Sequence, residues 1–373
     1  MRSINKKKLS IFLPGLYGGG AERILLNLAE GFTARGVLVD IVLAQKEGEF
    51  TRQIPHKVRL VSLRETQRSS LRTITALPSL VRYLKHEKPD ILLSALHGNL
   101  IAVWAKLLAH TNTRVVLTEH NTFSLENKAM YPRMQRLNAI LVRWFYPLSN
   151  DIIAVSNGVA DDLARSVGIK RNKIKVIYNP IINDTLFVKA NRVPDHPWFQ
   201  NSQIPIVISV GRLTEQKDYS MLLDAFQIVI KQANARLVIL GEGEDRNHLE
   251  RKVENLGLQE VVLLPGFVDN PYAYLAHSSV FVLSSRWEGL PTVLVEAMAC
   301  GLPVISTDCP SGPREILQSG KYGRLIPVGD LVALSVAILD GINGKISNPP
   351  PESWAGFTVK HTVDQYFSLL FEQ

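Results

Sequence analysis

The stretch RWEGLPTVLVEAMACGLPV, residues 286–304, contains a short helix followed by the start of a strand. Pro291 suits the first turn of a helix and Gly301 suits its C-terminal stop, so a helix is predicted over residues 292–300. Its apolar side chains leave no polar face, which predicts that it is buried. A buried helix that leads into the apolar strand PVISTD is typical of a parallel sheet covered by helices.

The same alternation continues in both directions from this stretch. The strand-like runs of the C-terminal half are IVISVGRL, RLVILGEGE, VVLLPGF and VFVLSS, and those of the N-terminal half are LSIFLPGL, VDIVLAQ, DILLSAL, RVVLTEH, DIIAVS and KIKVIYNP. A length of 373 residues exceeds what a single core normally holds. The predicted fold class is therefore α/β, with two tandem Rossmann-like, doubly wound domains.

Two breaks in the pattern suggest the domain boundaries. Residues 184–203 carry prolines and charges without a clear period, and we predict that they form the linker between domains 1–190 and 191–350. A proline-rich break at 349–351 precedes apolar residues at helical spacing, which predicts a terminal amphipathic helix within 351–373.

Composition excludes several classes of protein. Two cysteines cannot form a disulfide framework, and no apolar run reaches the length of a membrane span. The basic, apolar start resembles a signal peptide but is more simply a first buried strand. The first 190 residues carry a formal charge of +14 and the remainder −6, so the first domain is expected to meet an anionic surface or substrate. No nucleic-acid-binding motif is present, and we expect no nucleic-acid partner.

Two segments of the first domain concentrate its basic residues. The first is residues 51–88. The second, NKAMYPRMQRLNAILVRWFYPL, places Arg133, Arg136 and Arg143 among the aromatics Tyr131, Trp144, Phe145 and Tyr146. Basic residues with interfacial aromatics favour the surface of an anionic membrane. The alternative is a solvated helix face whose aromatics enter the core.

A glycine-rich turn, LPGLYGGGAERI, follows the first strand. Glycines such as Gly18 and Gly19 let a ligand approach the backbone at the start of a helix. Their order does not fit the dinucleotide fingerprint, so Asp40, at the distance of a ribose ligand, is weak evidence for such a site. The turn predicts only a ligand near the carboxyl end of the sheet.

Cations and carboxylates mark the second domain. Arg212 and Lys217 follow a strand, and a lysine just before a helix is disfavoured by the helix dipole unless an external anion lies there. A solvated surface lysine is the alternative. Glu288 precedes the predicted helix and Glu296 lies within it, where an unpaired carboxylate would be costly. Sugar hydroxyls could satisfy Glu296, although a core arginine could also pair with it.

The chain resembles family 4 of the retaining glycosyltransferases, which have the GT-B fold. The resemblance spans nearly the whole chain and rests on four motifs, GGGAER, GRLTEQKD, EGLPTVLVE and DCPSGPREIL. It implies two Rossmann-like domains with a central cleft, and a terminal helix that crosses back to the first domain.

The resemblance also implies a role for each candidate residue. The donor would be a UDP-sugar, acting as a co-substrate without any further cofactor. Arg212 and Lys217 would bind its diphosphate and stabilise the leaving group. The backbone near Val268 would contact the base, and Glu296 would hold the ribose. Glu288 would contact the sugar together with the backbone of Gly289 and Leu290. The turn with Gly18 and Gly19 would make the remaining contact with the donor.

His120, in TEHN, resembles the family's histidine at the reacting centre. The implied reaction retains the anomeric configuration and proceeds by front-face attack assisted by the leaving phosphate. The sequence contains no D-x-D motif, which agrees with a metal-independent reaction. We therefore predict no metal site, with His120, Glu288, Arg212 and Lys217 as the catalytic residues.

The resemblance implies an acceptor as well. A hexose or N-acetylhexosamine would be transferred to a glycan, on a polyprenyl diphosphate or a lipopolysaccharide, at the inner face of the cytoplasmic membrane. The expected location is cytoplasmic and peripheral. Two alternatives remain open at this point: a GT-B sugar-nucleotide epimerase, which needs no acceptor, and a non-catalytic module that binds carbohydrate or membrane.

Overall fold

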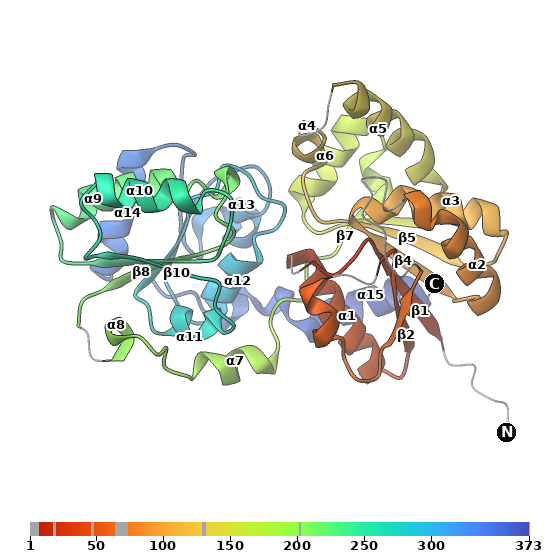
Figure 1. Ribbon diagram of the computed structural model, residues 1–373, viewed down its shortest axis with the longest axis horizontal. Helices are drawn as coiled ribbons and strands as arrows, with labels where there is room; N and C mark the ends of the chain where they lie inside the picture. The colour runs from red at the N-terminus through yellow and green to blue at the C-terminus, as the bar shows by residue number, and fades with distance from the viewer. Residues whose placement is uncertain are drawn as a thin grey trace. The chain divides into compact units, whose positions relative to one another are not determined.

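The chain folds into two compact units. The computed structural model describes residues 7–17, 20–45, 48–63, 74–128, 132–200 and 203–372. The first unit comprises Met1–Pro180 and Val359–Gln373, and the second comprises Ile181–Thr358. Each contains a parallel sheet flanked by helices, which confirms the predicted α/β class with two Rossmann-like domains (Figure 1).

Within its described residues, the first unit has a seven-stranded sheet in the order β3-β2-β1-β4-β5-β6-β7. Its strands are β1 Lys8–Leu13, β2 Leu38–Leu43, β3 Arg59–Ser62, β4 Ile91–Ala95, β5 Arg114–Glu119, β6 Asp151–Ala154 and β7 Ile174–Val176. Its helices are α1 Gly20–Ala34, α2 Leu77–Glu87, α3 Asn99–Ala109, α4 Phe123–Lys128, α5 Pro132–Phe145, α6 Asn157–Val167 and α15 Val359–Phe371. The strand order reverses between β1 and β4.

The described part of the second unit has a six-stranded parallel sheet in the order β10-β9-β8-β11-β12-β13. Its strands are β8 Ile206–Val210, β9 Arg236–Leu240, β10 Val262–Gly266, β11 Val280–Leu283, β12 Val304–Thr307 and β13 Arg324–Ile326. Its helices are α7 Asp184–Ala190, α8 Pro197–Gln200, α9 Tyr219–Ile230, α10 Arg246–Asn255, α11 Pro271–Ala276, α12 Thr292–Ala299, α13 Pro313–Ile316 and α14 Leu331–Ile342.

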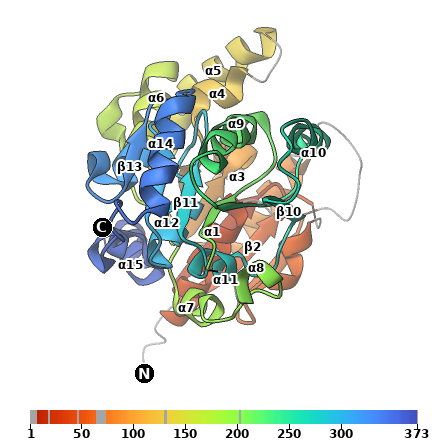
Figure 2. The same ribbon diagram turned by 90° about the vertical axis from the view of Figure 1, so that its left-hand side faces the viewer.

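Helices cover both faces of this second sheet. The helices α9 and α10 lie on one face and α11 and α12 on the other (Figure 1), and α14 lies beside α9 (Figure 2). Central strands such as β8 and β11 are buried on both faces, which explains their continuous apolar sequences. The strand order reverses between β8 and β11. Ligands of open α/β sheets bind outside the carboxyl ends of strands at such a reversal.

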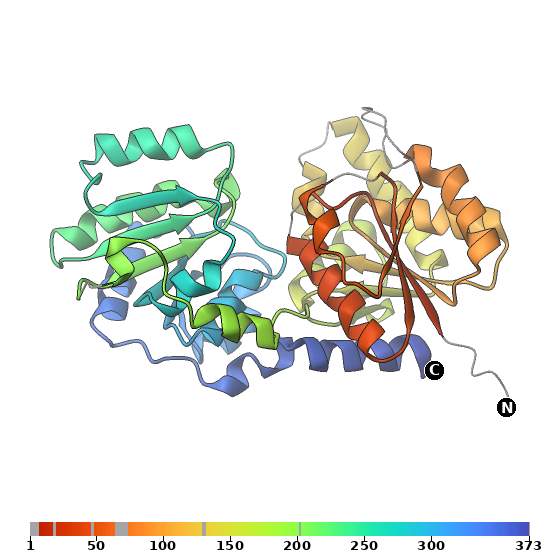
Figure 3. The same cartoon turned by 60° about the horizontal axis from the view of Figure 1, so that its bottom comes forward.

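The terminal helix α15 belongs to the first unit, where it packs against α1 (Figure 3). Gly31 makes the close approach possible, because a Cβ there would lie 2.4 Å from Val363 Cγ2. The rings of Phe367 and Phe371 pack near Phe32 of α1. At the end of the helix, Arg114 Nη1 donates to the carbonyl of Leu370 at 3.0 Å. A cation at a helix C-terminus complements the helix dipole.

The boundaries between units differ from the predicted ones. The second unit begins at Ile181, ten residues before the predicted start at 191. Residues 184–203, predicted as a linker, instead contain α7 and α8. These helices are too short to show a clear period, although α7 has a capping signal, since the Asn183 side chain accepts from Leu186 N at 3.1 Å. Residues 351–358 stay with the second unit, where Ile181 N donates to Phe357 O at 2.8 Å.

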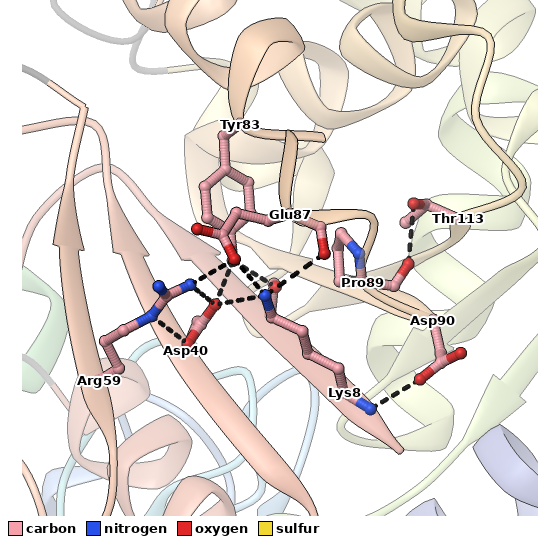
Figure 4. A network of polar contacts seen from close by, with 9 residues as sticks. Lys8, Asp40, Arg59, Tyr83, Glu87, Pro89, Asp90 and Thr113 are labelled. Carbon is pink, nitrogen blue, oxygen red and sulfur yellow. Dashed lines mark hydrogen bonds and ion pairs between the residues drawn. The ribbon is translucent and has the colours of Figure 1, made fainter. Parts of the chain in front are cut away.

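Asp40 is the centre of a charged network in the first unit, not a ligand group (Figure 4). Its carboxylate is buried and accepts from Arg59 Nε and Nη2 at 2.8 and 2.6 Å and from Tyr83 OH at 2.5 Å. Lys8 and Arg59 also pair with Glu87. Lys8 and Arg59 open β1 and β3, so this network lies at the amino ends of the strands. That is the opposite end from the one where ligands bind.

This network should make the protein sensitive to acid. Burial alone would raise the pKa of Asp40, but hydrogen bonds from Arg59 and Tyr83 outweigh it and hold that pKa below its usual value. Hydrogen bonds from Arg59 and Lys8 lower the pKa of Glu87 to about 2. Both carboxylates therefore stabilise the fold above their unfolded pKa values and lose that effect as pH falls through the folded ones.

We expect Asp40→Asn to reduce the free energy of unfolding by about 3 kcal/mol near pH 7, because it breaks a buried ion pair. Thermal denaturation at several pH values checks this. The gap in Tm between the natural protein and the variant should narrow as pH falls from 7 through the lowered pKa of Asp40, because Asp40 itself then becomes protonated. A gap of equal size at both ends of this range would contradict the assignment.

Candidate donor site in the second unit

The strongest candidate site lies where the second sheet reverses its strand order. Strands β8 and β11 are neighbours there, with Val207 opposite Val280. Residues 211–218 follow β8, and residues 284–291 follow β11. The two loops therefore leave the same edge of the sheet side by side, although they are about seventy positions apart in the sequence.

Lys217 and Glu288 meet across these loops. Lys217 Nζ donates to Glu288 Oε1 at 2.6 Å, and the hydroxyl of Ser285 donates to the same oxygen at 2.6 Å. The lysine side chain is 15% exposed and that of Glu288 is 7% exposed. Lys217 is therefore not a solvated surface lysine. A buried ion pair contributes little net stability to a fold, because removing two charges from water is costly. Such a pair on loops at the carboxyl edge of a parallel sheet is therefore a candidate for a functional site.

Gly211 provides the space through which Lys217 reaches Glu288. A Cβ at residue 211 would lie 3.0 Å from Lys217 Cε and 2.8 Å from the hydroxyl of the buried Tyr219. Any larger residue would displace one of these side chains. Gly211 is therefore required so that the side chains of Lys217 and Tyr219 can pack closely against its backbone.

The helix α12 follows Glu288 and carries Glu296. It spans Thr292–Ala299, close to the predicted range, and its side chains are buried apart from the first and the last. The backbone of Gly289 and Leu290 leads into its N-terminus, where free N–H groups and the helix dipole favour an anion. Glu296 is buried, and its Oε1 accepts from Tyr272 OH at 3.4 Å. A carboxylate has two oxygens that can each accept more than one hydrogen bond, so Glu296 can also accept from a ligand.

Arg212 and Val268 both follow strands of the second sheet. Arg212 follows β8 and is exposed, and it forms no hydrogen bond or ion pair with other described residues. Val268 follows β10 and is half-buried. Because β10, β9 and β8 are successive strands of one sheet, both residues lie at its carboxyl edge.

His120 is the predicted site residue that lies in the first unit. It follows β5, and its Nε2 lies 3.1 Å from the hydroxyl of Thr118. Its Nδ1 is buried without a hydrogen-bond partner among the described residues. Burial lowers the pKa of the imidazole to about 4, so His120 is neutral at pH 7. Gly18 and Gly19 lie outside the described residues.

Sequence reasoning missed several residues of this site. Ser285, which supports Glu288, and Tyr272, which contacts Glu296, carried no motif of their own. Arg286 and Asp218, which pair at 2.8 Å, were also missed. Ser285 and Arg286 lie within three positions of Glu288, so proximity to the motif was the only signal available.

Family models of glycosyltransferases match both the N-terminal and the C-terminal half of the chain. Residues 18–184 match the family model Glycosyltransferase Family 4, and residues 196–351 match Glycosyl transferases group 1. An uncharacterised glycosyltransferase of Methanocaldococcus jannaschii is 32% identical over 270 residues, which cover 66% of this chain and 65% of that protein.

A second relative is similar over more of its length. The N-acetylgalactosamine-N,N'-diacetylbacillosaminyl-diphospho-undecaprenol 4-alpha-N-acetylgalactosaminyltransferase of Campylobacter jejuni is 29% identical over 333 residues, with 86% of each chain covered. Among solved structures, HepE from Anabaena in complex with UDP and glucose has a TM-score of 0.81 at 20% identity, covering 98% of this chain and 100% of that one. This last likeness concerns the fold. With both units matched and the GT-B architecture in place, the chain belongs to the family 4 type of GT-B glycosyltransferases.

Proposed function

We propose that this glycosyltransferase moves a hexose or N-acetylhexosamine from a UDP-sugar to a lipid-linked glycan, with retention of configuration. The buried Lys217–Glu288 pair beside the N-terminus of α12 carries the proposal. It provides a cation for a diphosphate and a carboxylate for sugar hydroxyls within one small region. The complex of HepE with UDP and glucose supports a uridine nucleotide as the donor class.

Each candidate residue then has a role in holding the donor. Lys217 and Arg212 bind the diphosphate, and Glu288 accepts hydrogen bonds from the sugar, with the backbone of Gly289 and Leu290 beside it. The ribose hydroxyls donate to Glu296. We assign the remaining donor contacts to the backbone near Val268 for the base and to the turn with Gly18 and Gly19.

The chemistry needs no covalent nucleophile in this proposal. The bond from the anomeric carbon to the phosphate oxygen breaks, and UDP leaves with the electron pair. The acceptor hydroxyl oxygen bonds to the same face of that carbon, and its proton passes to the departing phosphate oxygen. Lys217 and Arg212 stabilise the charge that develops on UDP, as preorganised cations do in a site of low dielectric, and they do so without a metal ion. His120, neutral at pH 7, hydrogen-bonds the transferred sugar at the reacting centre.

The relatives and the charge of the first domain support the proposed acceptor class. The Campylobacter jejuni relative is named for a diphospho-undecaprenol acceptor and for transfer of N-acetylgalactosamine. Another relative, of Rhizobium meliloti, is named for lipopolysaccharide core biosynthesis. We propose an acceptor of this class, used at the inner face of the cytoplasmic membrane.

A donor and acceptor screen tests the function. Purified protein is incubated with a panel of UDP-sugars, with and without polyprenyl-diphosphate-linked glycans, and the release of UDP is followed. We expect release that depends on acceptor, and a product whose new linkage keeps the donor's configuration by NMR. Formation of an epimer from the donor alone would indicate the epimerase alternative. Binding without turnover across a broad panel would indicate a non-catalytic module.

The first unit also has a surface suited to a membrane. One side of α5 exposes apolar side chains next to Arg133, Arg136 and Arg143, and Trp144 is 70% exposed. The apolar residues, which we call the α5 surface, are Met134, Leu137, Ile140 and Trp144, with Leu148 and with Leu107 and Leu108 at the end of α3. No helix of the described residues has both the length and the apolarity to cross a bilayer. We propose that the α5 surface binds an anionic membrane at its interface.

The aromatic residues of this segment divide between surface and core. Tyr146 is buried, with its hydroxyl donating to Glu119 Oε1 at 2.5 Å, and Phe145 packs edge-on against Trp104. Tyr131 lies outside the described residues. Trp144 is therefore the described aromatic of this segment that supports the membrane proposal, whereas Tyr146 enters the core, as the alternative expected, and Phe145 is half-buried.

Neutralising Arg133, Arg136 and Arg143 to glutamine should weaken binding to anionic vesicles by roughly 100-fold, since each basic residue near such a surface contributes about 1 kcal/mol. Cosedimentation with vesicles containing phosphatidylglycerol measures this. A matched control replaces the exposed Arg165, Lys170 and Lys173 of the same unit and so removes equal charge. Equal losses in both triple variants would show that net charge, not the α5 surface, governs binding.

Glu296→Gln should impair donor affinity more than the chemical step. The substitution keeps the shape of the side chain but weakens the hydrogen bonds that ribose hydroxyls donate to it. We expect KM for the UDP-sugar to rise about 10-fold, with kcat within about threefold of the natural enzyme. Steady-state kinetics with a saturating acceptor gives both constants. An unchanged KM would remove Glu296 from the donor site.

A further inference from the structure

The two loops of the donor site are joined by a set of cross-loop contacts. The first loop is residues 215–218, which include the short 3₁₀ turn Glu215–Lys217, and the second is residues 284–288. Ser284 Oγ donates to the carbonyl of Lys217 at 2.7 Å, and Gln216 Nε2 donates to the carbonyl of Trp287 at 2.8 Å. Together with the Lys217–Glu288 pair, these contacts fix the first loop against the second.

Arg286 makes more of these contacts than its exposed position suggests. Its backbone N donates to the carbonyl of Gln216 at 2.8 Å. Its side chain bridges two acids on either side of Lys217, with Nη1 at 2.9 Å from Glu215 Oε1 and Nε at 2.8 Å from Asp218 Oδ2. Arg286 therefore holds the chain on both sides of Lys217, the residue whose ammonium contacts Glu288.

Asp218 gives this bridge a rigid support. It is buried and has a left-handed backbone, with φ of 49°, at the N-cap of α9. Its Oδ1 accepts from Met221 N at 3.4 Å, so one carboxylate oxygen faces the helix and the other faces Arg286. An Asp at this position can adopt such a backbone more readily than most residues.

We propose that Arg286 is a positioning residue for the transfer reaction. It holds the 215–218 loop so that Lys217 Nζ stays on Glu288 Oε1. The inference rests on the proposed function, in which these two side chains act on the donor. Lysine has a long flexible side chain, and an error of about 1 Å in its placement can slow a reaction about 100-fold. The ion pair of Arg286 with Glu215 joins side chains that are 43% and 74% exposed, and such pairs contribute about 1 kcal/mol or less to stability. The other partner, Asp218, is buried, but it also accepts a hydrogen bond from Met221 N, which does not depend on Arg286.

The large effect of misplacing Lys217 on the rate and the small effect of an exposed ion pair on stability together predict a variant that is less active but still folded. Arg286→Gln should lower kcat/KM by about 10–50-fold and change Tm by less than about 3 °C. Arg324→Gln is the matched control: its side chain is 53% exposed and pairs with Asp340 at 3.1 Å, at the opposite end of the same sheet. We expect it to leave the kinetics unchanged. A fall in Tm of more than about 8 °C for Arg286→Gln would assign it a structural role and contradict the proposal.

A double-mutant cycle with Lys217→Met decides whether Arg286 acts through Lys217. If it does, adding Arg286→Gln to Lys217→Met should slow the enzyme no further, because there is no ammonium left to place. A full additional loss in the double variant would overturn the proposal. The cycle also separates two failures. Natural activity in Lys217→Met would refute the proposed function itself, whereas an impaired Lys217→Met with a fully active Arg286→Gln would refute only the positioning role.

Discussion

Lys217→Ala should reduce kcat by about 100–1,000-fold, which is the usual effect of removing one preorganised donor from a developing negative charge. In the structure, the ammonium is nearly buried and lies 2.6 Å from Glu288 Oε1. Truncation removes the proposed diphosphate cation and also leaves the buried carboxylate with one donor fewer. The variant should therefore bind UDP about 10-fold more weakly as well, since an interaction with the diphosphate also exists in the ground state.

Two measurements separate these effects. The rate of UDP release at saturating donor and acceptor gives kcat, and isothermal titration with UDP alone gives the affinity. Lys231→Ala is a suitable control, because Lys231 is exposed at the far end of α9, the helix that follows Lys217. If Lys217→Ala retained activity within about twofold of the control, Lys217 would not be a catalytic residue.

Much of this architecture could be predicted from local patterns. The continuous apolar runs predicted buried parallel strands, and Pro291 and Gly301 marked the ends of α12 to within one residue. The helix expected just after Lys217 begins at Tyr219, with Asp218 as its N-cap. Proline, glycine and N-cap residues act on neighbouring backbone, so their effects can be recognised without knowledge of the fold.

The errors arose where local signals were short. The helix α7 has seven residues and α8 has four, so neither produces a clear apolar period. The proline-rich break at 349–351 predicts that residues 351–358 belong with the terminal helix. In the structure they pair with Ile181 and Ile182, a contact between segments more than 170 positions apart.

The pairing of Lys217 with Glu288 has the same non-local origin. The sequence singled out each residue by its motif, but nothing local places them together. Only the adjacency of β8 and β11 at the reversal of strand order does so. The supporting contacts of Ser285 and Arg286 depend on the same adjacency.

Glu288→Ala should abolish transfer, because it removes the carboxylate proposed to hold the donor sugar and leaves Lys217 without its partner in a nearly buried site. Glu288→Gln is the more informative change. Glutamine can still accept from Ser285 and Lys217, but without a charge, so the site should keep its shape while its hydrogen bonds weaken. We expect kcat to fall about 100-fold in this variant and the affinity for UDP, which lacks the sugar, to change less than about threefold.

The contrast with Glu296→Gln makes this prediction specific. Both glutamates are buried, and both substitutions preserve side-chain shape, so a general disturbance of the fold would affect the two variants alike. If Glu288 lies at the sugar and Glu296 at the ribose, the first variant should lose kcat and keep UDP affinity, and the second should show the opposite pattern. Steady-state kinetics combined with titration of UDP measures both. A reversed pattern would mean that the donor is bound in the opposite direction along α12, with the ribose at Glu288.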